Sequence, residues 1–289
     1  MNIAVMADIH SNHIALEACV SEAKRRRAEA FLFLGDYLGE FACPEKTLEL
    51  LGTIKKQYPC VFIRGNKEDY WISRKNGRYG DWVWEAGRSG SGMLAYVYER
   101  LAPEQIGEFE KLPVSATVRW PGFPAFVICH GSPWKTTESM REDYDYIDGL
   151  TKRLETELTI CAHFHIQSRY TRNGKRVVNP GAVGLPLRSN GDTQFMMLTG
   201  QAGKWDTGFI SLPYDREKAI REMDGENLSA QAPGWYRITK EVVRTGKASH
   251  LTALMKAQEL YKQHTGINDW KNIPEEYWNM ALAEMNVPE

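Results

Sequence analysis

Three short apolar runs near the start of the chain, each followed by a helical pattern, constrain the fold more than any other feature. They cover residues 3–7, 30–34 and 60–63, and none of them has a polar face. Runs of this kind are typical of strands that are covered on both sides. Repeated strand–loop–helix units predict parallel strands with helices on both faces of the sheet. We therefore expect an α/β fold.

Polar residues with metal-binding side chains follow five of the predicted strands. Beside the three early runs, they follow the apolar runs 125–129 and 158–162. Ligand sites in sheets of this type lie beyond the carboxyl ends of the strands. One histidine at a strand end is usually a satisfied polar residue, but five strands with such ends make that explanation much weaker. The residues are Asp8, His10, Asp36, Asn66, His130, His163 and His165.

The chemistry that fits these side chains is a pair of divalent cations. Carboxylate and imidazole groups suit Mn, Fe and Zn, and the absence of a thiolate disfavours a structural zinc site. In an extended chain the residues i and i+2 point the same way, so Asp8 and His10 can face one site, as can His163 and His165. Two ions held about 3.5–4 Å apart activate a shared water near neutral pH. Because histidine binds metal only when neutral, we expect activity to fall in mild acid.

The motifs around these residues resemble the calcineurin-like metallophosphoesterases. The order, spacing and strand context agree over residues 1–212, through Asp8-Ile9-His10, Gly35-Asp36, Gly65-Asn66, His130 and His163-Phe164-His165. The chain is similar above all to the compact bacterial and archaeal phosphodiesterase branch, through His130-Gly131-Ser132-Pro133 and Asn179-Pro180-Gly181-Ala182-Val183-Gly184. This resemblance implies a four-layer αββα sandwich with a dinuclear metal site at the strand ends.

The resemblance also implies how the residues divide between the two ions. The first ion would be held by Asp8, His10, Asp36 and His165. The second would be held by Asp36, Asn66, His130 and His163, so that Asp36 bridges the two. The candidate catalytic residues are Asp36, Asn66, Lys67 and Glu68.

One departure from the family pattern concerns proton transfer. Much of the superfamily has a histidine directly after the motif asparagine, and this chain has Lys67 there. The proton donor to the leaving group is therefore unassigned. Lys67 can contact a phosphate as a point charge, and it is a poor acid unless its pKa is lowered. Glu68 is a candidate for supporting a ligand.

Candidate substrate contacts are Asn12, His13 and Arg64. His13 lies on the first turn of a predicted helix, and its alternative role is that of a helix-surface residue. Arg64 precedes Gly65 and can pair with a phosphate, or equally form a structural ion pair.

The sequence predicts a main domain over residues 1–224 and a helical extension over residues 225–289. Residues 67–111 interrupt the strand–helix rhythm and are predicted as a helical insertion above the strand ends. Its aromatic residues either stack on a substrate or pack the insertion onto the domain. The extension is apolar and aromatic, so we expect it to dock on its own core domain, with a second copy of the chain as the alternative.

Composition narrows the class of function. The net charge is −1, which argues against a nucleic-acid-coating protein and for a small substrate. The five cysteines have no C-x-x-C spacing, and no signal peptide or membrane span is predicted, so we expect a cytoplasmic protein.

The predicted function is a metal-dependent phosphoesterase of small phosphodiesters or nucleotides, with diadenosine tetraphosphate as one example from the family. The alternatives are a protein-binding scaffold with the same fold, as in the retromer complex, and a nuclease.

Overall fold

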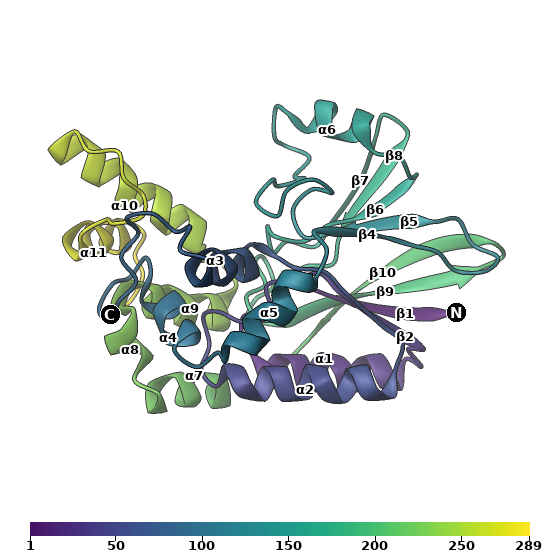
Figure 1. The fold of residues 1–289 in the computed structure, drawn as a ribbon, viewed down its shortest axis with the longest axis horizontal. Helices are drawn as coiled ribbons and strands as arrows, with labels where there is room; N and C mark the ends of the chain where they lie inside the picture. The colour runs from purple at the N-terminus through teal and green to yellow at the C-terminus, as the bar shows by residue number, and fades with distance from the viewer.

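Two five-stranded sheets packed face to face form the centre of the computed structural model, which describes residues 1–289 (Figure 1). The first sheet has parallel strands β1, β2 and β3, with β9 antiparallel to β1 and β10 antiparallel to β9. Its order is β10 (Lys204–Leu212), β9 (Thr193–Gln201), β1 (Asn2–Met6), β2 (Ala30–Phe33), β3 (Cys60–Phe62). The second sheet is also mixed, with antiparallel edge strands β4 and β7. Its order is β4 (Ser115–Val118), β5 (Phe126–Cys129), β6 (Leu158–Ile160), β8 (Lys175–Asn179), β7 (Ser168–Arg172).

The alternation of side chains along the strands places two separate cores on the faces of the first sheet. Ile3 and Val5 of β1 lie in the core between the sheets. Ala4 and Met6 point to the opposite face and join the larger core under the helices. Neighbouring residues of a strand point to opposite faces, so an entirely apolar strand is buried on both sides, as the sequence predicts.

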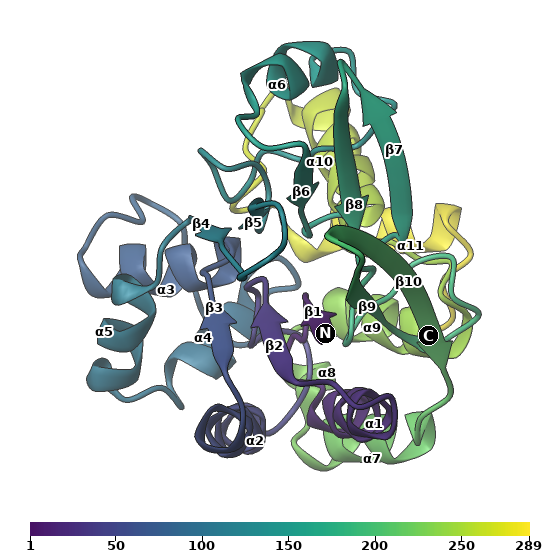
Figure 2. The ribbon, with the colours of Figure 1, turned by 90° about the vertical axis from the view of Figure 1, so that its right-hand side faces the viewer.

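Helices complete the four predicted layers. Helices α1 (His13–Arg25) and α2 (Pro44–Gln57) cover the first sheet, and α7 (Arg216–Gly225) packs against α1 (Figure 2). Asn12 caps α1, and its side-chain oxygen accepts a hydrogen bond from the backbone N–H of Ala15 at 3.1 Å. Helix α6 (Ile147–Arg153) packs on the outer face of the second sheet. The predicted α/β sandwich is confirmed.

The insertion and the C-terminal extension gather beyond the carboxyl ends of the strands. The insertion contains α3 (Asn66–Lys75), α4 (Gly92–Tyr98) and α5 (Pro103–Lys111). The extension contains α8 (Leu228–Gln231), α9 (Pro233–Thr245), α10 (His250–Thr265) and α11 (Glu275–Glu284). Both belong to one hydrophobic cluster, in which Trp71 and Trp278 are fully buried. The extension thus packs on its own chain, and many insertion aromatics pack inside the cluster.

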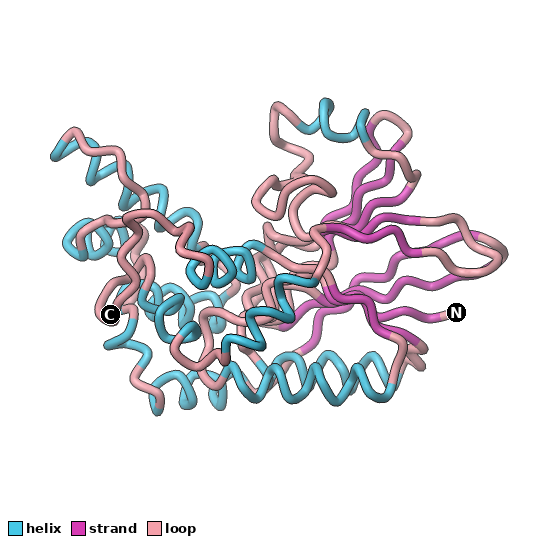
Figure 3. Tube along the Cα trace, viewed as in Figure 1, coloured by secondary structure: helices cyan, strands magenta, loops and turns pink.

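Loops fill the space between the strand ends and this group of helices (Figure 3). The chain leaves β1, β2, β5 and β6 through these loops. None of the helices combines the length and the apolar character that a bilayer crossing requires.

Candidate metal centre

The seven predicted ligands converge at the carboxyl ends of strands from both sheets. Five of them adopt a positive φ, which is uncommon for residues other than glycine. Each such residue costs about 1–3 kcal/mol, and strained backbone of this kind concentrates at functional sites. The five are Asp8, His10, Asp36, His163 and His165.

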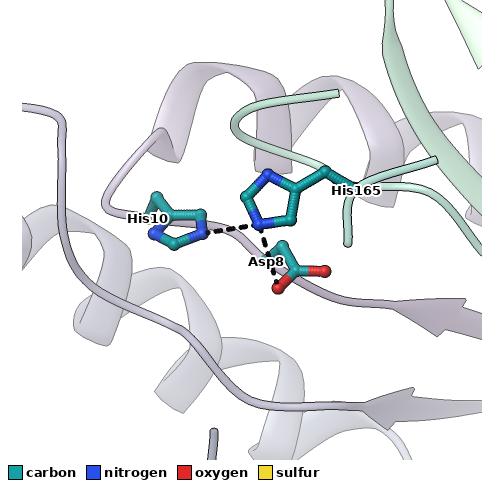
Figure 4. A group of neighbouring side chains, drawn as sticks. All are labelled: Asp8, His10 and His165. Atoms are coloured by element: carbon teal, nitrogen blue, oxygen red, sulfur yellow. Dashed lines mark hydrogen bonds and ion pairs between the residues drawn. The ribbon is translucent and has the colours of Figure 1, made fainter. Parts of the chain in front are cut away.

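Two clusters of side chains lie within metal-binding reach of each other. Asp8, His10 and His165 form the first cluster (Figure 4), in which Nε2 of His165 lies 3.3 Å from Nε2 of His10 and 3.4 Å from Oδ1 of Asp8. Asp8, Asp36 and His130 form the second. In it, Nε2 of His130 lies 3.5 Å from Oδ1 of Asp36 and 3.9 Å from Oδ1 of Asp8.

Hydrogen bonds on the far side of two imidazole rings fix which nitrogen faces the site. Nδ1 of His130 donates to the carbonyl of Leu34 at 2.8 Å, and Nδ1 of His165 donates to the carbonyl of Leu185 at 2.9 Å. Each Nε2 is therefore left with a lone pair that points inward. Lone pairs directed at carboxylates and at each other can share a cation held between them.

The carboxylates give a second indication that cations fit this site. Oδ1 of Asp8 is buried and has no hydrogen-bond partner in the protein. Burial raises the pKa of Asp36, and the charge of Asp8 adds to the rise although His10 opposes it. The two His/Asp clusters are thus consistent with a dinuclear metal site, and Mn, Fe or Zn can use these donors.

Asp36 lies between the two clusters. Its Oδ1 faces His130, and its Oδ2 lies 3.8 Å from Nε2 of His10. Asp8 belongs to both clusters as well. Either carboxylate, or both, has the position of a bridge, whereas the sequence resemblance gives that role to Asp36 alone.

The remaining two predicted ligands lie at the edge of the clusters. Oδ1 of Asn66 is 3.0 Å from Nε2 of His130. The ring of His163 lies 5.2 Å from that of His130, and the backbone N–H of His163 donates to Oδ2 of Asp8 at 3.2 Å. Burial lowers the pKa of His163 to about 3, so this ring is neutral at pH 7 and retains a lone pair for metal.

Glu68 supports the loop that carries Asp36 and does not line the cavity. Its carboxylate accepts hydrogen bonds from the backbone N–H groups of Gly65 at 2.7 Å, Asp36 at 2.9 Å and Tyr37 at 3.0 Å. Burial, with the charge of Asp36, raises the pKa of Glu68 to about 7. A fully buried side chain with these partners holds backbone in place, and the direct catalytic role expected from the sequence stays a prediction.

Lys67 faces the site but is tied to a carboxylate. Its backbone N–H donates to Oδ1 of Asp36 at 2.9 Å, and its Nζ pairs with Glu40. Burial lowers the pKa of Lys67, but the charges of Glu40 and Asp36 raise it by more. The side chain is therefore a cation beside the site and a poor proton donor.

The three predicted substrate contacts have other partners, and none lines the cavity beside the clusters. Asn12 caps α1 and donates to the carbonyl of Gly184 at 3.3 Å. His13 pairs with Glu222 at 2.7 Å, and Nε of Arg64 lies 2.9 Å from Oδ1 of Asp69. The structural alternatives given for His13 and Arg64 agree with the geometry.

Sequence reasoning missed three residues beside the site. Oε2 of Glu40 lies 2.5 Å from Nδ1 of His10. Trp235 of α9 donates from Nε1 to Oε1 of Glu40 at 3.1 Å, and the ring of His250 lies 4.6 Å from that of Trp235. No local motif marks them, and the one available signal was the aromatic character of the extension.

A cavity of about 430 Å³ adjoins the clusters. It extends from His10, Asp36 and His163 to side chains of the insertion and of the C-terminal helices. This volume is typical of pockets for small ligands.

Comparison with known proteins agrees with this geometry. The profile of the calcineurin-like phosphoesterase superfamily domain matches residues 1–203. The chain belongs to the calcineurin-like phosphoesterase superfamily. An uncharacterized protein from Methanocaldococcus jannaschii is 24% identical over 249 residues, which cover 81% of this chain and 94% of that protein.

Two crystal structures share the calcineurin-like phosphoesterase fold. A hypothetical protein from Pyrococcus horikoshii has a TM-score of 0.70 at 19% identity, over 86% of this chain and 99% of its own. A metallophosphoesterase from Sphaerobacter thermophilus has a TM-score of 0.62 at 20% identity, over 80% of this chain and 100% of its own. The superfamily match ends within the first sheet, so helices α7 to α11 lie beyond it.

Proposed function

We propose that this protein is a dinuclear-metal-dependent phosphoesterase that hydrolyses small phosphodiesters or nucleotides. The observation that carries the proposal is the meeting of two His/Asp clusters at buried carboxylates, with an unpartnered oxygen of Asp8 between them. Manganese, iron or zinc is the proposed metal. When bound, two such ions supply an activated water and neutralise charge on the phosphate.

The side chains of the protein would hold the ions in place and balance the charge of the bound phosphate. Asp8 and Asp36 hold negative charge at the centre of the site, and the ring nitrogens of His130 and His165 are fixed toward it. Lys67 places a positive charge at the cavity wall, where it can attract a phosphate. Asp36 and Asn66 remain our candidates for direct participation in the reaction, and Lys67 for a phosphate contact.

A cavity of about 430 Å³ favours a small substrate over nucleic acid. The near-zero net charge supports the same preference. A dinucleoside polyphosphate such as diadenosine tetraphosphate is a proposed example of the substrate. Either a phosphodiesterase or a phosphatase activity fits the ligand set. The absence of disulfides among the five cysteines supports a proposed cytoplasmic location.

The test is hydrolysis of bis-p-nitrophenyl phosphate by the purified chain with and without Mn²⁺. We expect turnover that needs metal and that falls by at least about a hundredfold in Asp36→Asn. The matched control is Asp148→Asn, an exposed residue of α6, which keeps full activity. Metal-independent turnover contradicts the proposal. No turnover under any metal contradicts it as well and favours the scaffold alternative.

A further inference from the structure

The cavity beside the candidate metal centre continues along an aromatic wall. The wall combines side chains from the insertion and from the C-terminal extension: Tyr70, Trp82, Trp235 and Trp270. The ring centroids of Trp82 and Trp270 are 5.0 Å apart, and those of Trp82 and Tyr70 are 5.3 Å apart. Tyr70 lies one helical turn after Asn66 on α3, so this wall begins beside the predicted ligands.

Trp235 connects the wall to the metal centre through Glu40. Its Nε1 donates to Glu40, and Glu40 contacts the ring of His10. The Nζ of Lys67 lies 5.8 Å from the Trp235 ring centroid. A phosphate held at the clusters would therefore have cationic and aromatic neighbours on the same side.

Two buried polar groups on the cavity wall have no partner in the protein. They are Nε1 of Trp82 and Oγ of Ser139, and the two residues are 6% and 8% exposed. An unpaired buried donor destabilises the fold, so such groups call for an explanation. A ligand with ring nitrogens or carbonyl oxygens can accept from both, whereas a hydrocarbon can accept from neither.

We propose that this wall is a subsite for a planar heteroaromatic ring, of the size of a nucleobase, attached to the substrate phosphate. The C-terminal extension then supplies part of the substrate specificity through Trp235 and Trp270. Base–aromatic stacking tolerates different bases because every base has a flat π-face. The inference rests on the proposed phosphoesterase function, because the phosphate positions the ring.

The test compares adenosine 5′-monophosphate with ribose 5-phosphate, which share the phosphate and sugar and differ in the base. Isothermal titration calorimetry in Mn²⁺ measures the Kd of each. We expect the nucleotide to bind wild-type protein about tenfold tighter. In Trp270→Ala we expect the two Kd values to become nearly equal, and in Trp270→Phe we expect part of the difference between them to return.

The matched control is Trp134→Ala, because Trp134 is 41% exposed, close to the 38% of Trp270, and lies outside the cavity. It keeps the wild-type ratio, and thermal melts check that both alanine variants fold. Equal Kd values for the two ligands in wild type, or an unchanged ratio in Trp270→Ala, overturn the subsite. Hydrolysis of bis-p-nitrophenyl phosphate tests the proposed function separately. A failure of the proposed function can therefore be told apart from a failure of the subsite.

Discussion

Glu40 contacts His10 on the side of the imidazole ring opposite the nitrogen that faces His165. Its Oε2 lies 2.5 Å from Nδ1 of His10. A carboxylate in this position orients the ring and makes the opposite nitrogen a stronger metal ligand. Glu40 also pairs with Lys67 and accepts from Trp235, so one buried side chain joins the metal centre to the C-terminal helices.

The contact between Glu40 and His10 predicts a loss of metal affinity when its charge is removed. Glu40→Gln keeps the size of the side chain, and we expect its Kd for Mn²⁺ to rise by about 10–100-fold. Titration calorimetry on metal-free protein measures this Kd. Glu49→Gln, on an exposed position of α2, keeps the wild-type affinity. Equal affinities in both variants would mean that Glu40 does not orient a ligand.

Divalent metal is expected to stabilise the fold, because Asp8 and Asp36 are buried together at the strand ends. Mn²⁺ at a hundredfold excess over its Kd contributes about 2.7 kcal/mol. That corresponds to a rise in Tm of about 4–5 °C for a chain of 289 residues. Thermal melts in Mn²⁺ and in EDTA measure the shift. Asp36→Asn should lose most of this rise in Tm. A rise of the same size in that variant argues against metal binding at the candidate metal centre.

The close approach of Gly65 to Asp36 predicts that a single methyl group disturbs the site. A Cβ on Gly65 would lie 2.2 Å from Oδ1 of Asp36. We expect Gly65→Ala to lower the free energy of unfolding by about 1–3 kcal/mol and to weaken Mn²⁺ binding.

The control for Gly65→Ala is Gly52→Ala, in the middle of α2, where nothing lies within 4 Å of the new Cβ. That change raises the free energy of unfolding by up to about 1 kcal/mol, because alanine is the better helix former. Urea unfolding measures both variants. Equal effects of the two substitutions would contradict a specific clash with Asp36.

The predicted ligands were recognisable because their signal is local. Each of them follows a short apolar run within a few residues, and parallel strands bring their carboxyl ends to one edge. Asn12 could likewise be predicted as a helix cap from its position before an apolar helical stripe. The pattern therefore predicted the sandwich, and it predicted which residues gather at one edge of it.

The partners of these residues depend on packing between distant segments, and the sequence does not encode them locally. Trp235 meets Glu40 across 195 residues of chain, and His13 meets Glu222 across 209. Whether an aromatic residue of the extension reaches the cavity is decided by how helices α9 to α11 dock. The sequence could not place His13 and Arg64 for this reason, since contacts with Glu222 and Asp69 hold these side chains away from the cavity, and their role as substrate contacts stays a prediction.

The same long-range contact predicts how stability depends on pH. Glu222 of α7 lies 2.7 Å from Nε2 of His13 on α1 and 3.0 Å from Nζ of Lys46 on α2. Partial burial raises the pKa of the Glu222 carboxyl, but these two hydrogen bonds lower it by more, and the net pKa lies below 4.5. A carboxyl whose pKa falls on folding stabilises the protein in its ionised form. This contribution is present above pH 4.5 and is lost as the pH falls through the folded-state pKa.

We therefore expect Glu222→Gln to lower the free energy of unfolding at pH 7 by about 0.5–1 kcal/mol. The difference from wild type shrinks as the pH falls below 4.5, because the wild-type carboxyl then becomes protonated and loses its charge. Urea unfolding at pH 7, 5 and 3.5 measures the difference. Glu217→Gln, exposed on the same helix, leaves stability nearly unchanged. A Glu222→Gln effect that is the same at all three pH values would mean that the pair with His13 and Lys46 is not what stabilises α7.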